Sequence, residues 1–234
     1  MNLGYKIDWW IKNVKLPQII ISDEIRKVAP NLVIWAIYAD VDVEKNNEKL
    51  WLMLNDLWNN IKIKVDEIVE QPNISSTRDA YLKCWKQPSK YRWSAESLLR
   101  RLAQWKWLYQ INTVVDINNY LSLKSLIPIG SYDLSNIEGD ITIGIWKSWE
   151  SYKWIWKDII NIEKLPVFSD NKWPFGSPTS DSERAMINLN SKKILIMMIS
   201  FWWNQNWDIK NFLNDWEKLL KEFVNWKNIE IKIY

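Results

Sequence analysis

Three short polar clusters contain the side chains in this sequence that are best suited to chemistry. The first, residues 115–120 (VDINNY), places Asn118 next to Asn119. An asparagine amide both donates and accepts hydrogen bonds, which suits recognition of hydroxyls, amines and esters. Asparagine is also a common helix-capping residue. The first cluster therefore predicts either a recognition site or a helix cap.

The second cluster, residues 128–133 (PIGSYD), contains Gly130 and Ser131 and is followed closely by Glu138-Gly139-Asp140. A glycine permits a close approach to the backbone or a positive φ. An ordinary turn is the competing interpretation of this cluster.

The third cluster, residues 176–184 (GSPTSDSER), gathers hydroxyls, carboxylates and a guanidinium within nine positions. Such a loop can present donors to a carbonyl or a phosphate. Alternatively, it satisfies its own polar groups, with Asp181 as a cap and Arg184 paired with an acidic residue. The polar residues of interest here are Thr179, Ser180, Asp181, Ser182 and Arg184.

The composition excludes several kinds of site. The chain has one cysteine, Cys84, and no histidine. It therefore cannot form an internal disulfide, a Cys/His zinc site, or a Ser-His-Asp or Cys-His catalytic unit. We expect no cofactor and no metal ion. Hydrolysis by a water molecule, with the substrate positioned by hydrogen-bond donors, remains open.

Basic residues gather between positions 83 and 106, although the whole chain carries a formal charge of only +3. Tyr81, Tyr91 and Trp105 are interleaved with them. This pattern is compatible with a surface for a nucleic-acid backbone, and a solvated helix face is the alternative. The cluster comprises Lys83, Lys86, Lys90, Arg92, Arg100, Arg101 and Lys106, of which Lys90, Arg92, Arg100 and Arg101 are the predicted tRNA-backbone contacts.

The elements that must position these clusters are a mixture of predicted helices and strands. A chain of 234 residues suffices for one sizeable domain or two small ones. The simplest interpretation is one α/β domain with its helices concentrated in the first half. Apolar spacing predicts helices over 23–29, 44–64, 76–86, 94–104 and 208–226 and in the second half of 112–123. Strands are predicted over 32–43, 139–146, 193–201 and 229–234, with hairpins and loops over 148–190.

No apolar run reaches the length needed to cross a bilayer, and the first ten residues do not have the pattern of a signal peptide. With a single cysteine, the default expectation is a reducing cytoplasm and no membrane partner.

The clusters, taken together and in order, resemble a known family. Residues 91–141 and 161–187 are similar to the tRNA-binding and editing (B3/B4) domain of the phenylalanyl-tRNA synthetase β subunit, in its free-standing form. The match is strongest over 77–199. The pairing of VDINNY and PIGSYD with the downstream PTSDSER loop is specific in order and spacing.

The resemblance implies a single domain over 1–234, folded as a three-layer β/β/α sandwich (α+β), with 208–226 as its C-terminal helix. It also implies a pocket that, in the synthetase, hydrolyses the ester of a tRNA carrying tyrosine in place of phenylalanine. The polar pair that lines that pocket corresponds to Asn118 and Asn119. The synthetase has a histidine in a proline-methionine-histidine stretch, and this histidine corresponds to Gly130 here. The chain departs from the family motif at that position.

The implied function is hydrolysis of mischarged aminoacyl-tRNA in trans, with tRNA or aminoacyl-tRNA as the partner. The alternatives are a non-catalytic RNA-binding module and a binder of a free amino acid or its derivative. Backbone N–H groups near Gly130 would receive the developing oxyanion. The predicted catalytic residues are Asn118, Asn119, Gly130, Thr179 and Ser180, and the predicted substrate-binding residues are Ser131, Asp181, Ser182 and Arg184.

Tryptophan is abnormally frequent in this sequence, with 19 tryptophans and only 5 glycines. At about 7% glycine, a chain of this length would contain roughly 16. The tryptophans repeatedly stand where the resembled family has glycine. One hypothesis is that the gene uses UGA for glycine and was translated with tryptophan; the other is that the rings stack on bases. UGG codons at Trp105, Trp107, Trp154 and Trp156 would contradict the first hypothesis. Similar positions are Trp35, Trp85, Trp149 and Trp173.

Overall fold

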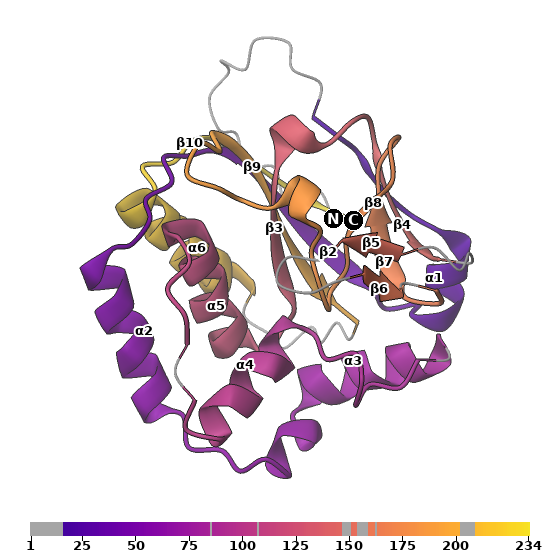
Figure 1. The fold of residues 1–234 in the computed structure, drawn as a ribbon, viewed down its shortest axis with the longest axis horizontal. Helices are drawn as coiled ribbons and strands as arrows, with labels where there is room; N and C mark the ends of the chain where they lie inside the picture. The colour runs from indigo at the N-terminus through magenta and orange to yellow at the C-terminus, as the bar shows by residue number, and fades with distance from the viewer. Residues whose placement is uncertain are drawn as a thin grey trace.

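The computed structural model arranges the chain in three layers, two β-sheets and a layer of helices (Figure 1). It describes residues 16–84, 86–106, 108–146, 151–153, 159–161, 163–201 and 209–234; of 151–153, 159–161 and 209–211 only the backbone is described. Trp85, Trp107, Trp149, Trp154 and Trp156 lie outside the described residues.

Two four-stranded sheets form the first two layers. In the outer sheet β1 (Ile19–Ile21) and β4 (Ile141–Ile145) are parallel, whereas the other pairs in both sheets are antiparallel. The outer sheet has the order β1 (Ile19–Ile21), β4 (Ile141–Ile145), β7 (Pro166–Ser169), β8 (Pro174–Gly176). The central sheet has the order β10 (Lys227–Ile233), β2 (Val33–Asp40), β9 (Lys193–Ser200), β3 (Ile129–Asp133). A separate hairpin pairs β5 (Ser151–Lys153) with β6 (Ile159–Asn161).

Strand β2 shows why the central sheet must be covered on both faces. Alternate side chains point to opposite faces of a strand. Ile34 and Tyr38 join the core between the two sheets, whereas Trp35 and Ile37 join the core under the helices. All four are buried. A strand that is apolar on both faces is stable only between two covering layers.

The helices form the third layer and an extension beside it. Helices α5 and α6 pack on the central sheet through a shared core that includes Ile117 and Trp216. Helices α2, α4 and the region around α3 share a further core that includes Trp58 and Trp93. The helices are α1 (Asp23–Val28), α2 (Glu48–Asn60), α3 (Pro72–Lys83), α4 (Ser94–Ala103), α5 (Thr113–Ser125) and α6 (Ile209–Phe223). Short 3₁₀ turns are η1 (Glu67–Glu70), η2 (Leu134–Asn136) and η3 (Glu183–Ala185).

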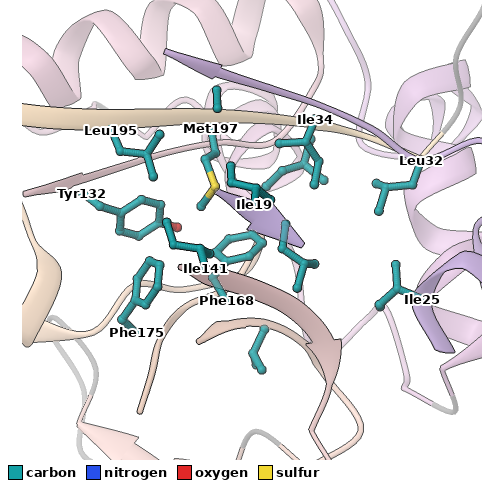
Figure 2. Close-up of a cluster of buried hydrophobic side chains, with 14 of the residues drawn as sticks. Ile19, Ile25, Leu32, Ile34, Tyr132, Ile141, Phe168, Phe175, Leu195 and Met197 are labelled. Atoms are coloured by element: carbon teal, nitrogen blue, oxygen red, sulfur yellow. The ribbon is translucent and has the colours of Figure 1, made fainter. Parts of the chain in front are cut away.

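The predicted three-layer β/β/α sandwich is confirmed by the order of these layers and cores. Figure 2 shows the core between the sheets, with Tyr132 and Leu195 of the central sheet near Phe168 and Phe175 of the outer one. Among the described residues, no helix is long and apolar enough to span a bilayer.

Three local predictions differ from the structure. Helix α5 is helical from Thr113 onward, capped by the Asn112 side chain on the Val115 N–H, and not only in its second half. Residues 129–133, for which an ordinary turn was one interpretation, form β3. Helix α3 begins at Pro72 and not at Ser76, because proline is favoured in the first turn of a helix.

The end of α4 places a tryptophan where glycine is strongly preferred. Trp105 has a φ of 56°, and its side chain is 81% exposed. The Trp105 N–H donates to the Leu102 carbonyl and the Lys106 N–H to the Arg101 carbonyl. This is the Schellman pattern, whose left-handed residue is usually glycine. Trp35 is the opposite case, because it is 1% exposed in the core and a glycine there would leave a large cavity.

We therefore expect Trp105→Gly to raise the free energy of unfolding by about 1 kcal/mol, the cost of a left-handed conformation for a residue with a Cβ. Urea unfolding measures the change. Trp105→Ala is the matched control, since it removes the same ring but keeps the Cβ. If both variants are equally stable, the gain does not come from the backbone conformation.

Candidate functional site

The loop after β8 is held between helices α3 and α4. The Thr179 Oγ1 and Tyr81 Oη lie 2.8 Å apart, which attaches the loop to α3. The Ser94 N–H at the start of α4 donates to the Pro178 carbonyl at 3.3 Å. The Ser94 Oγ accepts from the Ile129 N–H of β3, and Trp93 occupies the cap position of α4. The loop, α4 and β3 are thus linked by hydrogen bonds.

Within the loop, Ser177 and Ser180 satisfy one another. The Ser177 N–H donates to the Ser180 carbonyl at 2.8 Å, and the Ser180 N–H donates to the Ser177 Oγ at 3.0 Å. Both side chains are buried. The predicted catalytic hydroxyls Thr179 and Ser180 therefore already have partners, and their chief visible effect is to fix the loop.

The most distinctive contact of the site joins Tyr132 of β3 to Asp181. The Tyr132 hydroxyl donates to the Asp181 Oδ1 at 2.6 Å. The ring lies against two glycines: a Cβ on Gly130 would be 2.5 Å from the Tyr132 Oη, and one on Gly176 would be 2.7 Å from it. Tyr132 is fully buried between the sheets (Figure 2). The hydroxyl thus occupies the space that a side chain at position 130 would enter.

Tyr132 was not among the site residues predicted from the sequence. Its position two residues after Gly130 was the available signal, because residues i and i+2 of a strand lie on the same face. That signal required β3 to be recognised as a strand.

Two carboxyl groups, the half-buried Asp181 and the buried Asp116, have raised pKa values. Burial raises the pKa of Asp181 to about 7, although the hydrogen bond from Tyr132 acts in the opposite direction. Burial also raises the pKa of Asp116 on α5 to about 6, opposed by the bond that its carboxylate accepts from the Ile111 N–H. Asp181 is therefore the one of the two that changes protonation near neutral pH.

Arg184 is fixed by its own partners. Its guanidinium forms a bidentate pair with Asp170, with both N···O distances 3.0 Å, and also donates to the carbonyls of Asn136 and Trp173. Burial raises the pKa of Asp170, but the bonds from Arg184 and two backbone N–H groups outweigh it and hold that pKa below its ordinary value. Arg184 therefore pairs with an acidic residue, which was one of the two interpretations of the third cluster.

The predicted site residues lie on both faces of β3. Gly130 and Tyr132 face the outer sheet, whereas Ser131 alternates with them and faces the helices, as Ile129 does. Asn118 and Asn119 belong to α5, which packs on that helix side. Asn118 is 5% exposed, and its Oδ1 has no hydrogen-bond partner among the described residues.

Ser182 is a second buried side chain whose polar atom has no hydrogen-bond partner in the described part of the chain; here the atom is its Oγ. Buried polar atoms of this kind usually bind water or a ligand. The structure brings Gly130 and Asp181 together at Tyr132, and Thr179 and Ser180 precede Asp181 in the same loop. It leaves the asparagine pair and Ser131 on the other side of the strand.

The basic residues differ in their surroundings. Lys90 and Arg92 are exposed. The Arg100 Nε donates to Glu96 at 2.8 Å, and an Arg78 nitrogen reaches the same carboxylate oxygen at the same distance. The Arg101 guanidinium lies 4.6 Å from the centre of the Tyr109 ring. Lys90, Arg92 and Arg101 therefore remain candidates for contact with RNA, and Arg100 chiefly neutralises Glu96.

A separate cavity of about 990 Å³ opens at the other end of the sandwich, where β2 and β3 end and β9 begins. Asp40, Asp140 and Lys193 are among its lining residues, and so are Asp133 and Gly139 of the second sequence cluster. No predicted catalytic or substrate-binding residue lines it. In the part of the chain that the structure describes, no group of three or more Cys, Asp or Glu side chains is placed to hold a metal ion.

The sequence and the fold were compared with known proteins. A family model described as the B3/4 domain matches residues 76–206. No curated protein matches the sequence. Among solved structures, an N-terminal fragment of the phenylalanyl-tRNA synthetase β-subunit from Pyrococcus horikoshii is similar over 95% of this chain, with 12% identity and a TM-score of 0.48. This chain spans 52% of that fragment.

Proposed function

The chain belongs to the B3/4 domain family, and from this premise we propose that it is a single domain that binds tRNA and hydrolyses mischarged aminoacyl-tRNA in trans. The family model covers more than half of the chain and includes the first, second and third polar clusters. The resemblance of this domain to the tRNA-binding and editing domain of the phenylalanyl-tRNA synthetase β subunit supports a role connected with tRNA. The hydrolytic activity is our proposal.

One observation carries the proposal: the polar loop is attached to the same helices that flank the exposed cations. Thr179 bonds to Tyr81 of α3, and Pro178 accepts from Ser94 of α4. Lys90 and Arg92 lie in the segment between those two helices. RNA whose phosphates are bound there would bring its end close to the loop and to Asp181.

The proposed chemistry uses Asp181 as the proton acceptor. Its carboxylate, predominant above pH 7, takes a proton from a water molecule as the water oxygen bonds to the ester carbonyl carbon. Backbone N–H groups near Gly130 stabilise the resulting oxyanion. The ester C–O bond then breaks, and the ribose oxygen leaves with the proton that Asp181 returns. Tyr132 holds the carboxylate in place, and Arg184 takes no part because Asp170 occupies it.

A deacylation assay tests the activity. The protein is mixed with a panel of correctly and wrongly charged tRNAs, including tRNA of the phenylalanine type charged with tyrosine, and ester loss is followed over background. We expect selective loss from one mischarged species, with Asp181→Asn reducing turnover while RNA binding is retained. No ester loss from any species by a folded protein would contradict the proposal.

That negative result would favour a non-catalytic RNA-binding module, which one observation already supports. Thr179, Ser180 and Arg184 have their polar groups engaged within the protein. The two functions share the RNA surface, so the double variant Lys90→Gln/Arg92→Gln should weaken binding in either case and lower the salt dependence by about two charges. Lys192→Gln, at the cavity end of the molecule, is the matched control.

A further inference from the structure

We propose that Tyr109 and Arg101 form a stacking platform for an unpaired base of the bound RNA, an inference that rests on the RNA binding proposed above. Tyr109 lies in the segment that joins α4 to α5. None of the proposed hydrolytic steps uses it. The platform would give the basic surface a preference for single-stranded over duplex RNA.

The geometry of the pair supports this assignment. The Tyr109 side chain is 70% exposed, so one face of its ring is open to a ligand. The Arg101 guanidinium lies 4.6 Å from the ring centre, in the range of a cation–π contact. Leu108, next to Tyr109, is buried, which anchors the segment. The anchored backbone and the Arg101 contact restrict the ring before RNA binds, which lowers the entropy lost on stacking.

The charges around the platform favour a polyanion. Residues 80–112 contain seven basic residues and one acidic residue, whereas the rest of the chain contains 24 basic and 27 acidic residues. The single acidic residue, Glu96, is fully buried and is neutralised by Arg78 and Arg100. No carboxylate of this segment is therefore exposed to repel phosphates. An aromatic ring within a basic surface is the arrangement that single-stranded nucleic acids bind.

An unpaired base is the part of RNA that fits the platform. In a duplex each base is covered on both faces by its neighbours, so a protein ring can reach only an unpaired or terminal base. Stacking on tyrosine discriminates little among the four bases, because every base offers a π face. The platform thus selects single-stranded character and not sequence.

The exposed ring of Trp105 provides the internal control. It is 81% exposed and close in sequence, but its backbone is in the left-handed region, and no cation contact like that of Tyr109 with Arg101 is seen for it among the described residues. If any exposed ring sufficed, Trp105 and Tyr109 would contribute equally. The platform proposal predicts that only Tyr109 matters.

The experiment measures binding of the full chain to a short single-stranded RNA and to a long blunt RNA hairpin at several salt concentrations. The hairpin is closed by a non-nucleotide linker, so that all of its bases are paired. Tyr109→Ala is expected to weaken binding to the single strand about tenfold and to leave hairpin binding unchanged. Its salt dependence should not change, because no phosphate contact is lost. Tyr109→Phe keeps the ring and should bind like the parent, and so should Trp105→Gly.

The remaining outcomes overturn the inference in distinguishable ways. If the parent binds the single strand and Tyr109→Ala binds it equally well, the platform is wrong while RNA binding stands. If Tyr109→Ala weakens the hairpin as much as the single strand, the ring does not select an unpaired base. If the parent binds neither RNA, the proposed RNA binding fails and the platform with it. Because Tyr109 is exposed, the alanine variant should fold, which thermal unfolding verifies.

Discussion

Replacing Glu96 with alanine is expected to lower the free energy of unfolding by about 3 kcal/mol, the scale of breaking a buried ion pair. Glu96 is fully buried in α4, and one of its oxygens accepts from both Arg78 and Arg100 at 2.8 Å. Without the carboxylate, two guanidiniums face each other in a partly buried setting. The residual exposure of the two arginines, 23% and 17%, keeps the expected loss at the lower end of the range.

Guanidinium unfolding of Glu96→Ala measures this loss, with Glu138→Ala as the matched control. Glu138 pairs with Lys172 at 2.9 Å, but both side chains are 57% exposed. A pair in that setting contributes about 0.5 kcal/mol or less. Equal stability changes in the two variants would show that burial does not govern the energy of the Glu96 cluster.

The Glu96 cluster also illustrates what the sequence can and cannot reveal. Arg100 follows Glu96 by four residues, so their pairing across one turn of a helix is visible from the spacing. Arg78 comes from a different helix, and only the packing of α3 beside α4 brings it to the same oxygen. Arg100 is a predicted tRNA-backbone contact that the structure shows paired with Glu96, because an exposed arginine and a paired one look identical in a sequence.

Helices and strands with a strong periodicity of apolar residues could be predicted from the sequence, whereas those with a weak periodicity could not. Strands β2 and β9 are rich in β-branched residues, and α6 has a regular apolar face. The first turn of α5 contains two valines, which lower helix propensity, but the Asn112 cap and burial against the central sheet override it. Strand β3 is short and contains a glycine, so its pairing with β9 had no local signal.

The site was predictable only in part for the same reason. The loop 176–184 and the segment 128–133 were recognised, and the structure does join them, through Tyr132 and Asp181. Gly130 and Ser131 lie on opposite faces of β3 because successive side chains of a strand alternate. This could not be predicted while the segment could also have been a turn. The raised pKa of Asp181 depends on burial by distant residues, which leaves no trace in the local sequence.

Protein stability is expected to fall by about 1.4 kcal/mol between pH 6 and pH 8, as Asp181 loses its proton in the folded state. Burial raises the pKa of Asp181 from 3.8 to about 7, so the folded protein retains a proton that the unfolded chain has already released. The stabilisation from that proton is complete below pH 3.8 and disappears as the pH rises through 7. Asp116 has the same sign, but its contribution to stability is lost as the pH rises through about 6.

The absence of histidine makes this window unusually clear, since no histidine titrates between pH 6 and 8. Asp181→Asn keeps an oxygen that can accept from Tyr132 and removes the titration, so its stability should be flat where that of the parent declines. Asp116→Asn, the control, should retain the decline. If Asp181 is also the proton acceptor, ester hydrolysis should rise with pH to a plateau above 7 and fall at least a hundredfold in Asp181→Asn. If the stability of the parent shows no change of slope near pH 7, Asp181 does not change protonation there, and the physical basis for assigning it the proton is removed.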